Sequence, residues 1–161
     1  MARNVEIWTD GSCNNDRHNK YGNLGGWAFT VHIDGELIEE DLGFHQKATS
    51  STMEMEAVIR SLEYCKKIKL KKCEINIHSD SAMIVNCFRQ QWFIKWQEND
   101  YFGVKNPGLW KHMIDLFFFL KNRNKVKFIK VKGHSGIEEN ERVDFLAGEA
   151  RRYLMDKVDG K

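Results

Sequence analysis

The order in which the hydrophobic pattern changes along the chain is the feature that most constrains its fold. Apolar and polar residues alternate with the period of a β-strand in three early segments, residues 5–10, 25–33 and 36–44. The dipeptide Asp34-Gly35, a strong signal for a tight hairpin turn, separates the second segment from the third. These segments predict that the fold begins with a β-meander.

From Thr49 onward, helical patterns alternate with single strands. Helices are predicted over residues 49–67, 81–88, 90–98, 109–122 and 138–155, and strands over residues 75–80 and 125–132. A meander followed by such units predicts an α/β fold, in which a five-stranded mixed sheet carries helices on both faces. The fourth strand returns after a helical crossover, so it should lie parallel to the first, with Asp10 and Asp80 at neighbouring carboxyl ends.

Length and composition indicate one compact domain over residues 1–161. A chain of this size, with 42% hydrophobic residues, buries a sufficient core without a disulfide or metal staple. The four cysteines show no zinc-like spacing, so we expect free thiols. No apolar run is long enough to span a membrane, and residues 1–12 lack the core of a signal peptide. We therefore expect a soluble, cytoplasmic monomer.

The net charge of +2 hides two strongly basic runs. Residues 60–72 carry six Lys or Arg and one Glu, and residues 121–132 carry six and no acid. Runs of this kind are usually solvated faces, but they are also compatible with a polyanion bound at the surface.

Four carboxylates, Asp10, Glu54, Asp80 and Asp144, stand at positions that secondary structure alone does not require. Each has a purely structural interpretation. Asp10 precedes a glycine and is compatible with a turn, and Asp80 with a helix cap. Glu54 follows Ser51 at the spacing of a capping box, and Asp144 is compatible with an exposed helix acid.

Taken together, the four acids favour a metal site. Two of them end neighbouring strands, and the other two lie on helices that must pack over the same sheet. Carboxylates that converge on one point repel and raise one another's pKa unless cations neutralise them. Mg²⁺ prefers such oxygen ligands, and two ions about 3.5–4 Å apart can serve an in-line phosphoryl displacement.

Six sequence pieces occur in an order and at a spacing that together specify one family. They are Thr9-Asp10-Gly11-Ser12, Thr49 through Met53-Glu54 with Ala57, Ser79-Asp80-Ser81, Trp92-x-x-x-Trp96, Val131-Lys132-Gly133-His134-Ser135-Gly136, and Asn140-Glu141-Arg142-Val143-Asp144 with Leu146-Ala147. On these pieces the chain resembles type 1 ribonuclease H over nearly its whole length. The resemblance implies the ribonuclease H-like fold and, because no segment precedes the catalytic strand, no N-terminal hybrid-binding domain.

The resemblance also implies an activity and a set of catalytic residues. The expected enzyme is an endonuclease that hydrolyses the RNA strand of an RNA–DNA hybrid and leaves 3′-hydroxyl and 5′-phosphate ends. Asp10, Glu54, Asp80 and Asp144 match the family's ligands for two Mg²⁺ ions, which Mn²⁺ can replace, with Asp10 shared between the ions. His134 matches a mobile histidine that assists proton transfer or product release.

Substrate contacts are implied in the same way. The positions that contact the hybrid hold Ser12, Cys13, Asn14, Asn15, Thr49, Ser50, Ser51, Trp92, Lys95, Trp96 and Asn106. The chain has Ser50-Ser51 where many relatives have two carboxamides, and serine offers fewer hydrogen bonds. The basic handle of the family corresponds to residues 88–106, where this chain balances its cations with Glu98 and Asp100. We therefore expect weaker, less salt-dependent binding there.

Three other interpretations compete with this one. A non-catalytic nucleic-acid-binding domain of the same fold would be expected to lack at least one of the acids, and all four are present. A related integrase or exonuclease acting on DNA is disfavoured by the motifs around Lys132 and Asn140. A purely structural protein leaves the convergence of acids unexplained.

Overall fold

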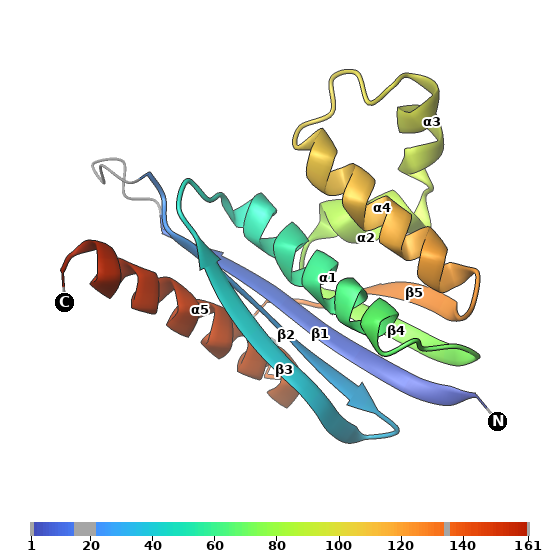
Figure 1. The fold of residues 1–161 in the computed structure, drawn as a ribbon, viewed down its shortest axis with the longest axis horizontal. Coiled ribbons are helices and arrows are strands. Elements are labelled where there is room, and N and C mark those ends of the chain that lie inside the picture. The colour runs from blue at the N-terminus through green and yellow to red at the C-terminus, as the bar shows by residue number, and fades with distance from the viewer. Residues whose placement is uncertain (1, 15–21, 134–135, 161) are drawn as a thin grey trace.

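The structure is a computed structural model that describes residues 2–14, 22–133 and 136–160 (Figure 1). Two predicted site residues, Asn15 and His134, lie outside the described residues. The strands are β1 (Arg3–Cys13), β2 (Gly25–Ile33), β3 (Glu36–His45), β4 (Cys73–Ser79) and β5 (Lys125–Lys130). The helices are α1 (Ser50–Lys67), α2 (Ala82–Arg89), α3 (Trp92–Glu98), α4 (Pro107–Lys121) and α5 (Glu138–Val158).

The strands form one five-stranded mixed sheet, as predicted, and their order in it is β3-β2-β1-β4-β5. The meander pairs β1 with β2 and β2 with β3 in antiparallel fashion. The crossover through α1 returns β4 parallel to β1, and β5 is parallel to β4. The middle of the sheet is therefore the place where an antiparallel half meets a parallel half.

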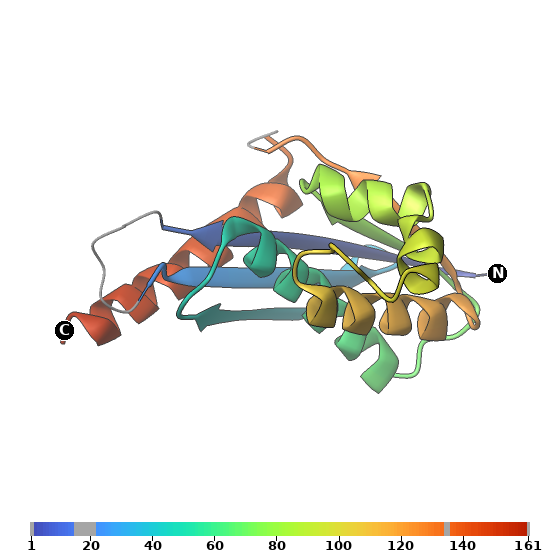
Figure 2. The same ribbon diagram turned by 90° about the horizontal axis from the view of Figure 1, so that it is seen from above.

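Helices cover both faces of the sheet (Figures 1 and 2). On one face, α5 packs against β1, β2 and β3 and closes a small apolar cluster. On the other face, α1 lies over β1 and β2 and packs against α4. This second face holds the main core, in which β-strand residues such as Ile7 and Ile77 are fully buried.

No disulfide stabilises this fold, since the structure describes all four cysteines. All four cysteines are free thiols, as expected, and Cys65, Cys73 and Cys87 are buried. Burial raises the pKa of Cys65 and Cys87 to about 12, which makes both thiols inert. Within the described ranges, no helix combines the length and the apolar character that a membrane span needs.

Some element boundaries differ from the predictions. The first strand does not end at Asp10 but continues to Cys13, because residues 9–13 pair with residues 25–29 of β2. The fourth helix starts two residues early, at Pro107, which suits the first turn of a helix because it has no N–H to satisfy. The last helix continues to Val158, and β5 stops at Lys130.

Candidate active site

Asp10 lies where the parallel half of the sheet ends. The last parallel pair between β1 and β4 joins Trp8 to His78, so Asp10 and Asp80 each follow two residues after that pair. Asp10 itself pairs only with Ala28 of β2. The parallel pairing of β1 with β4 confirms the prediction that Asp10 and Asp80 follow neighbouring strands at the same edge of the sheet.

Gly11 brings the first turn of α1 against β1 and so places Glu54 near Asp10. A Cβ added at Gly11 would collide with the backbone nitrogen of Glu54 and would lie 2.5 Å from the carbonyl carbon of Met53. No side chain fits in this space without moving the backbone. The glycine after Asp10 is therefore required by close packing between strand and helix.

The structural interpretation of Glu54 is wrong, because α1 is capped by other residues. Thr49 Oγ1 accepts a hydrogen bond from the Thr52 N–H at 3.0 Å, and Thr52 Oγ1 accepts one from the Thr49 N–H at 2.9 Å. The reciprocal capping box thus joins Thr49 to Thr52 and does not use Ser51 or Glu54. Glu54 is left with no role at the helix terminus.

The structural interpretation of Asp80 is wrong for the same reason. Ser81 caps α2, and its hydroxyl oxygen accepts a hydrogen bond from the Ile84 N–H at 3.3 Å. Asp80 precedes the cap, and its Oδ1 atom is buried without a hydrogen-bond partner. A buried carboxylate oxygen without a hydrogen-bond partner is costly in a folded protein.

The four acids act on one another electrostatically. Asp80 and Asp144 both act on Asp10, and Asp80 acts on Glu54. Burial, followed by the charges of Asp80 and Asp144, raises the pKa of Asp10 to about 8. Burial, followed by the charge of Asp80, raises the pKa of Glu54 to about 7. Burial also raises the pKa of Asp80.

A divalent cation fits this centre. Burial and the neighbouring carboxylates raise the pKa values of these acids, and Asp80 Oδ1 lacks a hydrogen-bond partner. The donors are carboxylate oxygens, which suit hard ions of the Mg²⁺ class. In the part of the chain that the structure describes, no three or more acidic, histidine or cysteine side chains are arranged to hold a metal ion. The residues that would hold an ion are Asp10, Glu54, Asp80 and Asp144.

Four of the predicted substrate contacts meet in one hollow. Thr49, Ser51, Trp96 and Asn106 line a surface cavity of about 390 Å³, together with Lys105. Asn106 has a left-handed backbone with φ 56°, and its side chain makes no capping hydrogen bond to α4. Its carboxamide is therefore available to a ligand, whereas the Thr49 hydroxyl already caps α1.

The other predicted contacts differ in how free their side chains are. Ser12 and Ser50 are partly or fully exposed. The Cys13 thiol donates to the Ala48 carbonyl oxygen at 3.4 Å, and Asn14 Oδ1 accepts from the Leu24 N–H at 2.8 Å. These two side chains hold the surrounding loops, so fewer of their polar atoms can reach a substrate.

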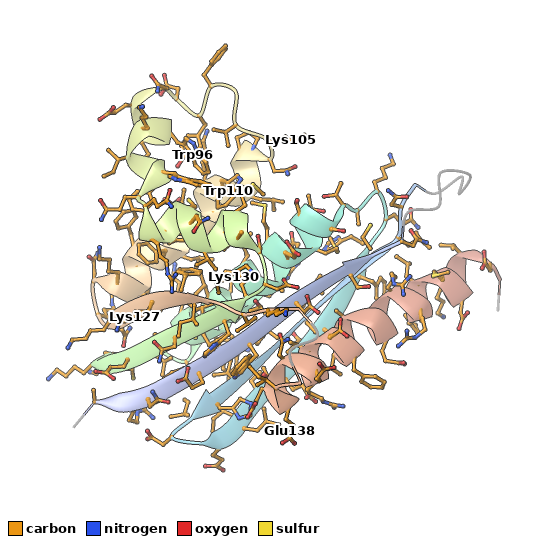
Figure 3. All side chains as sticks on the ribbon, turned by 180° about the vertical axis from the view of Figure 1, so that it is seen from behind. Trp96, Lys105, Trp110, Lys127, Lys130 and Glu138 are labelled. Carbon is orange, nitrogen blue, oxygen red and sulfur yellow. The ribbon has the colours of Figure 1, made fainter. Side chains whose placement is uncertain are left out.

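The handle has an aromatic base and few free cations. Trp96 packs edge-on against Trp110, with ring centroids 4.9 Å apart, and Trp92 lies 6.0 Å from Trp96 (Figure 3). Lys95 is exposed, but Arg89 donates from Nε to the Phe128 carbonyl oxygen at 3.1 Å and is tied to β5. The tryptophans thus serve packing, and Lys95 and Lys105 carry the free charge of this segment.

The comparison with protein families decides which fold family this is. The family model described as RNase H matches residues 2–152. The chain belongs to the RNase H family. This membership confirms the family predicted from the six sequence pieces and the enzyme class, an endonucleolytic ribonuclease H.

Individual relatives of this RNase H agree. The chain is 35% identical over 150 residues to Ribonuclease H of Thermoanaerobacter sp. (strain X514), covering 90% of this chain and 88% of the relative. The crystal structure of LC9-RNase H1, described as a type 1 RNase H with the type 2 active-site motif, has a TM-score of 0.79 at 21% identity, covering 95% and 74%. LC11-RNase H1, solved in complex with an RNA/DNA hybrid, has a TM-score of 0.67 at 22% identity, covering 94% and 99%. The predicted fold is confirmed.

Lys130 is a charged residue near the acids of this RNase H that sequence analysis did not single out. It pairs with Ser79 at the end of β5, and its Nζ donates to the Val131 carbonyl oxygen at 2.9 Å (Figure 3). Its positive charge lowers the pKa of both Asp80 and Glu54, against the effect of burial. Its position directly before the Val131-Lys132-Gly133 piece was the only sequence signal.

Replacing Lys130 should shift the pH dependence of cleavage. Without this charge, the pKa values of Asp80 and Glu54 rise, so Lys130→Met is expected to move the acidic limb of kcat/KM to higher pH. The shift should stay below about one pH unit, because exposed charges interact weakly. The measurement is a pH–rate profile at fixed Mg²⁺, with Lys127→Met on the same strand as the control. An acidic limb that does not move would contradict the assigned role.

The raised pKa values also predict how metal-free stability depends on pH. Asp10 binds its proton more tightly in the folded state, where its pKa is about 8 against an ordinary 3.8, and Glu54 behaves alike. The folded state therefore holds more protons than the unfolded state between these values, and the free energy of unfolding falls as pH rises from 4 to about 8. Denaturant melts in EDTA across this window should show the loss. Stability that rises over it would contradict the site's electrostatics.

Proposed function

We propose that this RNase H hydrolyses the RNA strand of RNA–DNA hybrids with two divalent ions, Mg²⁺ or in its place Mn²⁺, held by Asp10, Glu54, Asp80 and Asp144. The observation that carries the proposal is the meeting of four acids from four separate elements in a family of ribonucleases. Bound ions of this class activate a water and stabilise the leaving oxygen of a phosphodiester.

The four acids and Lys130 are proposed to have different roles. Asp10, on the central strand, would help to hold both ions, and Asp144 would help to hold the ion that activates the attacking water. Glu54 and Asp80 would hold the ion that stabilises the leaving group. The positive charge of Lys130 lowers the pKa of both Glu54 and Asp80 and so opposes the effect of burial on these two acids.

The substrate is gripped beside the acids. The hollow between Thr49 and Asn106 has the size and the polar lining to accept a backbone phosphate of the DNA strand, with Lys105 adding charge. Ser51 lines this hollow, and Ser12 and Ser50 are partly or fully exposed. These three serines offer short hydroxyls to the sugar edges. One copy of the chain contains all of these groups, so we propose a monomeric enzyme.

Cleavage assays test the proposal directly. An RNA–DNA hybrid, double-stranded RNA and double-stranded DNA, each end-labelled, are incubated with Mg²⁺, with Mn²⁺ and with EDTA. Internal cuts that need metal and occur only in the RNA of the hybrid are expected. Cleavage of DNA would favour an integrase-like activity, and tight hybrid binding without any cuts would indicate a non-catalytic binding domain.

His134 is proposed to assist proton transfer or product release. Since the metal site supplies most of the catalysis, His134→Ala should slow turnover about 10²–10⁴-fold without abolishing it, the range typical of general acid–base groups. Single-turnover and steady-state rates on the hybrid separate the two roles, because a defect in product release lowers only the steady-state rate. A variant with unchanged rates would remove His134 from the mechanism.

A further inference from the structure

The two basic runs of the sequence meet at one end of the molecule. The turn between α1 and β4 and the turn between α4 and β5 lie side by side, and the Lys72 N–H donates to the Arg123 carbonyl oxygen at 2.8 Å. Figure 1 places both turns near the N-terminus of the chain. Two adjoining hollows open there, and Arg123 lines both of them.

The buried side-chain amide of Asn124 holds the two turns rigidly together, and we call the place where they meet the joint. Asn124, which is 9% exposed, accepts a hydrogen bond from the Cys73 N–H at 3.0 Å and donates to the carbonyl oxygens of Leu70 and Leu120 at 3.0 and 3.1 Å. Every polar atom of this side chain is thus used to tie the two turns together. The cations on these turns therefore stand on a fixed support.

The surface of this joint is densely and almost uniformly basic. Lys66, Lys69 and Lys71 line the first hollow, Lys72, Lys121 and Lys125 the second, and Arg123 both; we call these seven residues the basic platform. All seven are exposed, and among the described residues none forms an ion pair. Glu74 is the one acid that lines either hollow.

The basic platform is separate from the catalytic centre. Glu54 lies in the first turns of α1 and Lys66 near its last residue, which places them about 18 Å apart along the helix axis. The same separation appears along β4, which starts at the platform and runs about 20 Å to Asp80. The platform therefore marks the opposite end of the sheet from the acids.

We propose that the basic platform is a second nucleic-acid-binding surface, which holds the phosphate backbone of a segment outside the catalytic groove. This inference rests on the proposed function, since it assumes that the protein works on nucleic acid. Closely spaced Lys and Arg on one face are the electrostatic signature of phosphate-backbone binding. Because the handle has only Lys95 and Lys105 as free cations, another surface is needed to bind much of the phosphate backbone.

An acidic protein segment fits the platform less well. The core of a protein–protein interface is depleted of lysine and rich in accessible aromatic surface. The platform offers one ring, Phe119, and that ring is already covered by Lys66 at 4.5 Å and by Arg123 at 3.9 Å. Little apolar surface is left for a partner's side chains, whereas phosphates need only the cations.

Binding at the platform would keep the enzyme on its substrate. A duplex segment held there raises the effective concentration of neighbouring hybrid at the catalytic groove without any new contact at the acids. The expected effect is a lower KM for a hybrid embedded in long duplex DNA than for a short isolated hybrid. The value of kcat should not depend on the platform, because no platform residue reaches the catalytic centre.

The test reverses one charge in each hollow, with Lys71→Glu and Lys125→Glu in one protein. Both side chains are exposed, and in the described structure neither makes a hydrogen bond, so the fold should remain intact, which a thermal melt checks. The matched control is Arg152→Glu with Lys157→Glu on α5, which changes the net charge equally. A fluorescent hybrid, just long enough to fill the catalytic groove, is titrated at low salt in EDTA.

The wild type and the control should bind two short hybrids per protein, and the platform variant one. With the hybrid embedded in long duplex DNA, the platform variant should have a KM about tenfold higher than that of the wild type and an unchanged kcat. The slope of log Kd against log salt concentration should be smaller by about two in the variant. A stoichiometry of one in the wild type, or equal KM values in variant and control, would overturn the proposal. The proposal would also be overturned if the platform variant no longer bound an acidic polyglutamate peptide but bound nucleic acid as the wild type does. A wild type that binds hybrid but never cuts it would instead refute the proposed function.

Discussion

Asp10→Asn is expected to abolish cleavage and, at the same time, to stabilise the metal-free protein. Asparagine keeps the size of the side chain but cannot carry the charge that two ions would share. Loss of a residue that merely supports a metal ligand costs about 10–100-fold, so loss of a shared ligand should lower kcat by well over about a hundredfold. The measurement is single-turnover cleavage of a hybrid at saturating Mg²⁺.

The gain in stability follows from the electrostatics of the folded site. Asp10 is buried beside Asp80 and Asp144, and its pKa is raised to about 8, so above that pH its charge opposes folding. Removing the charge should raise the melting temperature in EDTA at high pH, by about 2–4 °C for each kcal/mol of relief in a protein of this size. The same variant should lose the part of the fall in stability between pH 4 and 8 that Asp10 contributes, while Glu54 and Asp80 keep their own parts.

Two controls make this prediction strict. Asp41→Asn, on the exposed edge strand β3, changes the net charge equally and should alter neither activity nor the pH dependence of stability. Adding Mg²⁺ should raise the melting temperature of the wild type and much less that of Asp10→Asn. Near-normal turnover in Asp10→Asn would remove Asp10 from the metal site.

Gly11→Ala is expected to damage both the fold and the active site. The added methyl group meets the backbone of Met53 and Glu54, which cannot rotate away as a flexible side chain would. Overpacking of this kind costs about 1–3 kcal/mol. Since the first turn of α1 must move, Glu54 moves with it, and a displacement of about 1 Å at a reacting centre can cost about a hundredfold in rate.

Gly108→Ala is the matched control for this variant. Gly108 lies in the first turn of α4, where an added Cβ would have no neighbour within 4 Å. The substitution should leave stability within about 0.5 kcal/mol of the wild type and cleavage unchanged. Comparable thermal melts and kcat/KM values for Gly11→Ala and Gly108→Ala would show that the close approach of β1 and α1 does not position Glu54.

The elements of the fold could be predicted because they depend on local periodicity. Alternation of apolar residues identified the meander, and helical spacing identified α1 and α5, since each pattern repeats within a few residues. Boundaries were less accurate where a tertiary contact extends an element. The extension of β1 beyond Asp10 depends on pairing with β2, which no property of residues 11–13 indicates.

The four acids could be named in advance, but their surroundings could not. From sequence spacing, a capping box with Ser51 also explained why Glu54 is present. Only the structure shows that Thr49 and Thr52 cap α1 instead. Capping depends on where the first helical residue falls, and a shift of two residues changes the partner. Until the capping residue is known, a carboxylate at the start of a helix can be either part of the cap or part of a functional site.

The sequence by itself determined the order of strands and helices along the chain and the family, and it singled out the four acids that we propose as metal ligands, because these follow from patterns along one chain. Only the tertiary structure decided which charges meet. Lys130 stands beside Asp80 because β5 pairs with β4 in one register, and the two basic runs form a single platform because Asn124 ties their turns together. Electrostatic energy depends on distance in space, and sequence separation does not measure that distance.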